Sequence, residues 1–217
     1  MAPLPDPKSE DGVMRERLRV MSDADTSDVA VLTRPLPAML DFGCVGIMLP
    51  PRFAPELVWD ADESRLAAAV EVLYDFRLVD GERRLRIRRD LPLREVTREM
   101  AVQDIGEEMT VGFGGGRPPC KIPAELVLER QGYASVLPAI GAIALSPDGS
   151  IWVRRRAIKD EPRIIDLFDA EGVYLGTLPS DSPFPAAFGP SGDVVAIEKD
   201  EMDIDHLVIY RIERGES

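Results

Sequence analysis

A strand–turn–strand pattern that recurs along this chain constrains its fold more than any other feature of the sequence. The clearest copy runs from SPDGSIWVRRR (146–156) into RIIDLFDAEGVYLGTLP (163–179), where turn residues separate segments rich in β-branched and aromatic residues. Comparable turns contain Asp62, Asp148 and Gly192, which are separated by 86 and 44 positions. The second spacing is close to half of the first, and a period of about 40–45 residues is the length of one four-stranded repeating sheet.

Four further segments repeat parts of this pattern. A turn followed by a strand is found in WDADESRLAAAV (59–70) and GPSGDVVAIEKD (189–200). A hairpin is expected in VLYDFRLVDGERRLRIRRDLP (72–92), and a closing strand in HLVIYRIERG (206–215). The sequence therefore predicts a mainly β fold that is built from successive small sheets.

Residues 94–140 interrupt the pattern and predict a helical insertion. The segment after Thr97, a potential N-cap, is rich in helix-forming residues. A second short helix is expected over 122–132, because Pro123 lies near its start and Gly132 just after its end. The expected organisation is an N-terminal extension with a degenerate repeat (1–55), one four-stranded unit (56–93), the helical and loop insertion (94–140) and two C-terminal units (141–217).

The order of these motifs resembles the six-bladed β-propeller proteins of bacteria that are related to the NHL and TolB-like groups. The resemblance rests on LPAIGAIALSPDGSIWVRR (137–155), LFDAEGVYLGTLP (167–179) and HLVIYRIER (206–214). It implies an all-β fold in the form of a partial β-propeller of about three to four blades with a short helical insertion, since the chain is too short for six blades. Members of the family usually carry an export signal, and none is visible here.

The charge of the chain and the incomplete ring indicate the kind of partner. A formal net charge of −13 repels phosphate backbones, so nucleic acid is not expected as a partner. An incomplete ring leaves open sheet faces, which favour association with another chain. The sequence therefore predicts a non-enzymatic protein–protein interaction module, an accessory or structural subunit of a larger assembly. Three alternatives are an extrinsic subunit docked on a membrane-protein complex, a lactonase-like propeller hydrolase and a small-ligand sensor.

The two cysteines do not predict a metal site. Cys44 and Cys120 are far apart and neither belongs to a CxxC pair, so neither a zinc site nor a disulfide framework is expected. Two free thiols suit a reducing compartment, and one long-range disulfide is the alternative. No signal peptide is visible and no stretch has the ~20 apolar residues of a membrane span. A cytoplasmic location, with no transmembrane segment of its own, is the expectation.

Two basic stretches are candidates for contact with a partner. Because side chains alternate along a strand, three arginines of ERRLRIRR (82–89) are expected on one face, with Leu85 and Ile87 on the other. An acidic partner or an anionic membrane surface would suit such a face. The candidate contact residues are Arg84, Arg86, Arg88, Arg154 and Arg156.

Evidence for a metal site or for catalysis is weak. The run KDEMDID (199–205) offers oxygen ligands of the kind that Ca²⁺ prefers, but it lacks the EF-hand pattern and is typical of a solvated loop. The weak calcium candidates are Asp200, Glu201, Asp203 and Asp205. His206 is the single histidine, so no second histidine exists for a metal–histidine site or for a catalytic pair. No catalytic residue and no cofactor are expected.

Overall fold

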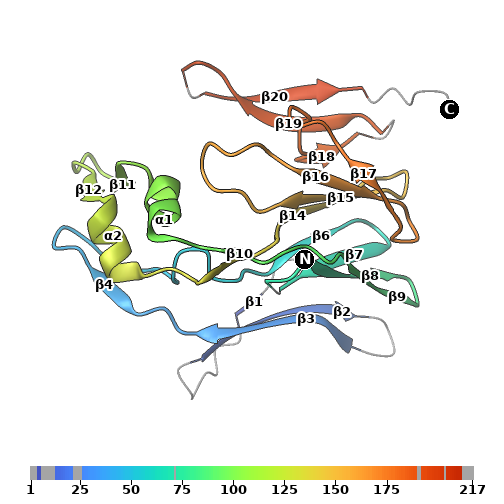
Figure 1. Cartoon of the computed structure of the whole chain (residues 1–217), viewed down its shortest axis with the longest axis horizontal. Helices are drawn as coiled ribbons and strands as arrows, with labels where there is room; N and C mark the ends of the chain where they lie inside the picture. Colours follow the sequence, from blue (N-terminus) through green and yellow to red (C-terminus); the bar gives the residue numbers. More distant parts are fainter. Residues whose placement is uncertain are drawn as a thin grey trace.

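The computed structural model describes residues 4–5, 13–21, 26–70, 72–189, 192–202 and 204–211. In this part of the chain, four antiparallel sheets are stacked in the order of the sequence (Figure 1). Each sheet is a meander, because its strands are hydrogen-bonded to their neighbours in the sequence. The fold is mainly β, as the sequence predicts.

The four stacked sheets have three or four strands each. The first sheet contains β1 (Leu4–Pro5), β2 (Val13–Met21) and β3 (Thr26–Pro35). The second contains β6 (Val58–Ala61), β7 (Arg65–Ala69), β8 (Asp75–Asp80) and β9 (Arg83–Arg88). The third contains β14 (Ile140–Leu145), β15 (Ile151–Arg155), β16 (Ile165–Phe168) and β17 (Tyr174–Thr177). The fourth contains β18 (Ala187–Phe188), β19 (Val194–Lys199) and β20 (Asp205–Tyr210).

A smaller unit lies at the side of the stack, next to the ends of the strands (Figure 1). It contains the helices α1 (Arg98–Ile105) and α2 (Ala124–Gln131) and three short strand pairs. These pairs are β4 (Met39–Asp41) with β5 (Gly46–Met48), β10 (Arg94–Glu95) with β13 (Val136–Leu137), and β11 (Glu108–Val111) with β12 (Cys120–Pro123).

The structure confirms both predicted helices, the predicted start of α1 at Thr97 and the predicted end of α2 at Gly132. The Thr97 hydroxyl accepts a hydrogen bond from the Met100 backbone N–H at 3.3 Å, which caps the start of α1. Pro123 precedes α2, and Gly132 ends this helix with a φ of +69°, a conformation that glycine adopts without steric cost. Local sequence signals therefore fix the helical part of the insertion.

Each pair of adjacent sheets encloses its own apolar core. The inner strands are consequently apolar on both faces, as β15 illustrates. Ile151 and Val153 are fully buried against the second sheet, whereas Trp152 points to the other side and packs toward the fourth sheet. Because successive side chains of a strand point to opposite faces, this apolar run requires a layer on each side.

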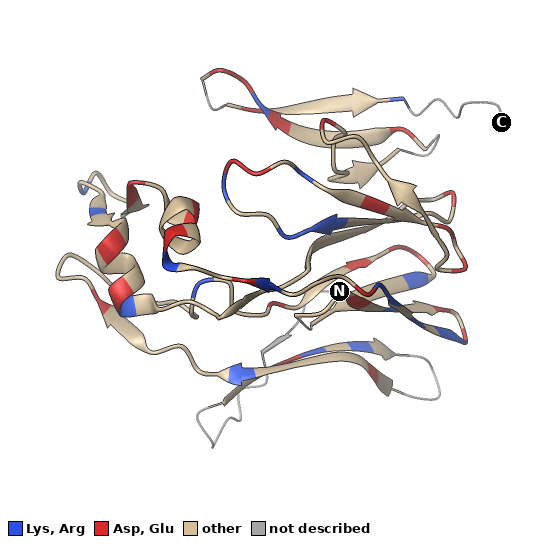
Figure 2. Ribbon diagram, viewed as in Figure 1, with Lys and Arg blue, Asp and Glu red and all other residues tan. Residues whose placement is uncertain are grey.

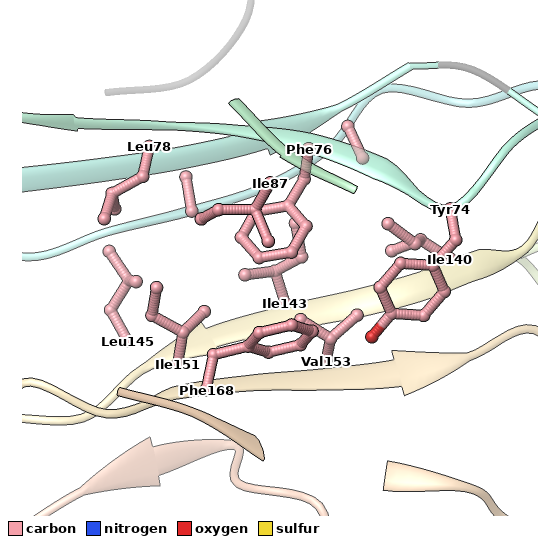
Figure 3. Packing of buried hydrophobic residues seen from close by; sticks show 12 residues of the cluster. Tyr74, Phe76, Leu78, Ile87, Ile140, Ile143, Leu145, Ile151, Val153 and Phe168 are labelled. Atoms are coloured by element: carbon pink, nitrogen blue, oxygen red, sulfur yellow. The ribbon is translucent and has the colours of Figure 1, made fainter. Parts of the chain in front are cut away.

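The largest core lies between the second and third sheets (Figure 3). Phe76 of β8 and Phe168 of β16 meet edge to face, with ring centroids 5.4 Å apart. Tyr74 and Tyr174 contact the ring of Phe168 as well, at 6.2 and 5.7 Å between centroids. Phe168 thus joins the two central sheets by aromatic contacts that stabilise beyond their buried area.

The expectation of two free thiols is wrong. A disulfide joins Cys44 and Cys120, whose Cα atoms are 5.9 Å apart. It links the β4–β5 hairpin to β12, and Cys120 lies in a small core with Ile122 and Val127. The two cysteines are 76 positions apart, so only the fold brings them together.

Any larger residue in place of Gly172, in the turn between β16 and β17, is expected to destabilise the fold. Gly172 has a φ of +81°, and a Cβ atom at this position would lie 2.7 Å from Cγ1 of Ile87. Gly172→Ala should lower the free energy of unfolding by about 2–3 kcal/mol, because backbone strain and overpacking add. Gly43→Ala is the matched control, with a φ of +80° and no atom within 4 Å, and should cost only ~1 kcal/mol. Urea denaturation measures both, and equal losses would refute the clash with Ile87.

Candidate functional site

The outer face of the fourth sheet is apolar and uncovered. Val194 and Ala196 of β19 are buried against the third sheet, so the residues that alternate with them point outward. On the outer face, Val195 is paired with Ile209 and Ile197 with Leu207 across the two strands. These four residues, Val195, Ile197, Leu207 and Ile209, are called the apolar face below.

The exposure of the apolar face is unusual for side chains of this size. Leu207 is 75 % exposed, Ile209 71 % and Ile197 53 %. Single exposed apolar residues are common on protein surfaces, but here they form two cross-strand pairs on one sheet. An exposed apolar patch on a sheet is a candidate surface for contact with another molecule.

The opposite end of the stack has a different chemistry. Arg15 is paired with Thr33 on the first sheet, and Arg19 forms an exposed ion pair with Asp28 at 2.7 Å. A head-to-tail stack of two copies would press the apolar face onto these polar groups, which would lose their hydration. The first sheet is thus the more polar of the two outer sheets, although Val31 of β3 is 40 % exposed.

The predicted arginines of β9 share a face but serve the fold. Leu85 and Ile87 pack into the central core, so the arginines that alternate with them point away from it. Arg86 and Arg88 both bind the buried carboxylate of Asp75 on β8. Burial by itself raises the pKa of Asp75, but these two arginines outweigh it and hold this pKa below its usual value. Arg84 donates to the Gly81 carbonyl at 2.6 Å.

The predicted arginines at the end of β15, Arg154 and Arg156, form a cluster with Arg163. The Arg154 guanidinium lies 4.8 Å from the centroid of the Phe184 ring. Burial lowers the pKa of Arg154, and the nearby charges of Arg163 and Arg156 lower it further. Arg156 donates to Glu56 at 3.3 Å. Arg154, Arg156 and Arg163 are called the arginine cluster below.

The calcium candidates do not converge. Asp200 accepts hydrogen bonds from the backbone N–H groups of Met202 and Ile204, at 2.8 and 3.0 Å. It also lies 2.9 Å from Nε2 of His206, whose hydrogen bond lowers the pKa of Asp200. In the described part of the chain, no three acidic, histidine or cysteine side chains are placed to hold a metal ion.

Of the other candidates in that run, the structure describes Glu201 and Asp205. Glu201 is exposed in the turn, and Asp205 stands opposite Lys199 at the end of the β19–β20 ladder. Asp203 lies outside the described residues. The position of Asp200 thus agrees with a local turn, in which the carboxylate satisfies backbone donors.

The structure also reveals a buried ion network that the repeat pattern did not predict. Asp166 of β16 is fully buried and accepts two hydrogen bonds from Arg155, at 2.9 and 3.0 Å. Arg89, which follows β9, lies 2.8 Å from the same carboxylate and stacks 3.7 Å from the Tyr174 centroid. Thr177 donates to Asp166 at 2.6 Å. A single aspartate inside the apolar run RIIDLF was the available signal.

The network around Asp166 connects the second and third sheets, because Asp166 and Arg155 belong to the third sheet and Arg89 follows the last strand of the second. Burial raises the pKa of Asp166, but the hydrogen bonds from Arg155 and Thr177 and the charge of Arg155 outweigh it, so this pKa lies below its usual value. The carboxylate remains ionised and fully paired. Such an arrangement stabilises the stack and does not supply a general acid or base near neutral pH.

Comparisons with known proteins give no relative for this chain: no family model, no curated protein and no solved structure matches it. Among the described residues, no helix is long and apolar enough to cross a membrane.

Proposed function

We propose that this chain is a non-enzymatic protein–protein interaction module, an accessory subunit that binds another protein chain through the apolar face. The observation that carries the proposal is the exposure of Leu207 and Ile209 on β20, the edge strand of a sheet whose other face is packed. The partner supplies the next apolar layer of the stack.

The proposal includes an interpretation of the fold as an open arc of β-propeller blades. Four successive meander sheets with the sequence period of one blade support it. In a closed propeller every blade is covered by its neighbours, whereas an arc leaves a face open at each end. The apolar face is then the surface that a neighbouring blade would cover.

The size of the apolar face limits how strong such a complex can be. Complete burial of its four side chains would contribute about 6–12 kcal/mol, at ~1.5–3 kcal/mol for each. Association itself costs about 4–15 kcal/mol in lost freedom, so the apolar face can anchor a partner but needs further contacts. Stable interfaces bury about 800 Å² on each partner, which is more than four side chains supply.

The experiment that tests this proposal compares two aspartate variants in the complex isolated from the native source. Leu207→Asp with Ile209→Asp is expected to weaken binding at least about 100-fold, because it places charges in the buried centre of the interface. Size-exclusion chromatography with light scattering measures the loss of the heavier species.

Leu175→Asp is the matched control, since Leu175 is 61 % exposed on β17, away from the apolar face. Circular dichroism should show that both variants fold, because neither position is buried. An unchanged complex with the double variant would contradict the proposal. An equal loss of the heavier species in the Leu175→Asp control would contradict it as well.

A further inference from the structure

A pocket opens at one end of the second and third sheets, where β7 and β15 end and β8 and β16 begin. Its volume is about 190 Å³. Its apolar lining comes from Leu73, Leu91, Leu93, Leu137 and Ile164. Leu93 is 55 % exposed, Leu73 47 % and Ile164 38 %. Three large apolar side chains thus line the pocket and still face solvent.

The volume of the pocket decides which kind of ligand fits. Pockets for small molecules and cofactors usually measure about 300–1,000 Å³, so this pocket is too small for most of them. It has room for a single apolar side chain. Recognition of a protein segment by pockets that each take one side chain is a common mode of peptide binding.

The surroundings of the pocket are basic, although the chain as a whole carries a net charge of −13. Arg94, Arg155 and Arg156 line the pocket. Glu161 neutralises Arg94, and Asp166 neutralises Arg155. Basic residues gather at the end of β15 (Figure 2). The positive charge that remains uncompensated comes from the arginine cluster beside the pocket.

Arg163 is the most accessible member of the arginine cluster. It is exposed and forms no ion pair with a carboxylate in the part of the chain that the structure describes, whereas Arg154 is partly buried against the ring of Phe184. Arg156 has a weak partner, because Glu56 lies 3.3 Å away and is 53 % exposed. Exposed ion pairs of this kind contribute little and exchange readily for another carboxylate.

We propose that this pocket and the arginine cluster bind an acidic segment of the partner protein, which inserts one apolar side chain into the pocket and places its flanking carboxylates on Arg156 and Arg163. This inference rests on the proposed function as a protein-interaction module and names the chemistry of the partner. Arginine suits the task because its planar guanidinium binds carboxylates in a bidentate manner. The site supplies a second contact in addition to the apolar face.

The test uses synthetic peptides and the isolated chain. The probe is a five-residue blocked peptide with a central leucine between two pairs of glutamates. One comparison peptide has serine in place of leucine, and the other has glutamines in place of the glutamates. Methyl NMR reports binding at Leu73, Leu93 and Ile164 directly.

The leucine–glutamate peptide is expected to shift these three methyl groups at millimolar concentration or below. The serine peptide should bind about tenfold or more weakly, because it loses the burial of one leucine. The glutamine peptide and Arg163→Glu should each weaken binding at least about fivefold, and added salt should weaken it as well.

Arg117→Glu is the matched control, because Arg117 is an exposed arginine in the β11–β12 loop and carries the same charge change. It should leave peptide binding unchanged. No shift of the three methyl groups up to millimolar peptide would overturn the proposal, and so would equal binding of the three peptides.

The Leu207→Asp with Ile209→Asp variant separates this proposal from the proposed function. Peptide binding should survive in that variant, since the pocket lies between the second and third sheets. If that variant still forms an unchanged complex and still binds the peptide, only the proposed function is wrong. If the variant loses the complex but the unmodified chain does not bind the peptide, only this inference is wrong.

Discussion

Asp166→Asn should lower the free energy of unfolding by about 3–5 kcal/mol, the cost of leaving buried charges without their counterion. Asp166 is 0 % exposed, and its carboxylate binds Arg155 and lies 2.8 Å from Arg89. Without the negative charge, two guanidinium groups would face each other where the second and third sheets meet. Urea denaturation followed by circular dichroism measures the change.

Asp28→Asn provides the control for this substitution. Asp28 also pairs with an arginine, Arg19, but both side chains are more than a third exposed. Its replacement should change the free energy of unfolding by less than about 1 kcal/mol. Similar losses in the two variants would show that burial does not determine the strength of the Asp166 network.

The Asp166 network also predicts how stability depends on pH. The pKa of Asp166 in the folded chain lies below the usual value of an aspartate, because its hydrogen bonds to Arg155 and Thr177 favour the ionised form. The ionised carboxylate therefore stabilises the fold above the pKa of the unfolded state, about 3.9, and this stabilisation disappears as the pH falls toward the lower folded value. The loss of stability between about pH 4 and pH 2 should be smaller in Asp166→Asn.

Phe168→Ala should destabilise the chain by a similar amount, about 3–5 kcal/mol, through the cavity that it leaves. The Phe168 side chain is 1 % exposed and contacts the rings of Phe76, Tyr74 and Tyr174. These contacts join the second and third sheets (Figure 3).

Leu175→Ala is the control for the Phe168 variant, since Leu175 lies on the neighbouring strand β17 and is 61 % exposed. Leu175→Ala should lower the free energy of unfolding by less than about 0.5 kcal/mol. Thermal and urea unfolding of both variants measure the difference. A loss below 1 kcal/mol for Phe168→Ala would mean that the two sheets do not share this core.

Local features of the fold could be predicted from the sequence. Turn residues and strand propensity indicate the mainly β architecture, and Thr97 and Gly132 mark helix ends that the structure confirms. These signals act within a few residues, so they can be recognised without knowledge of the fold. Alternation likewise predicts the shared face of the β9 arginines.

Contacts between distant segments could not be predicted in the same way. Cys44 meets Cys120 only because the β4–β5 hairpin folds onto β12. The spacing of Arg86 and Arg88 shows that they share a face but not that both bind Asp75 on the neighbouring strand. The apolar residues Leu207 and Ile209 suggested an ordinary strand, and only the stacking order leaves them uncovered.

Whether the apolar face binds another protein can be decided by native mass spectrometry of the protein isolated from its source, combined with hydrogen exchange of β19 and β20. We expect a particle well above the 24.0 kDa of the chain, with a second kind of protein chain in fixed ratio. We also expect β19 and β20 to exchange more slowly in this particle than in the isolated chain. A stable species of 24.0 kDa, with equal exchange in both samples, would rule out a subunit that is covered at the apolar face.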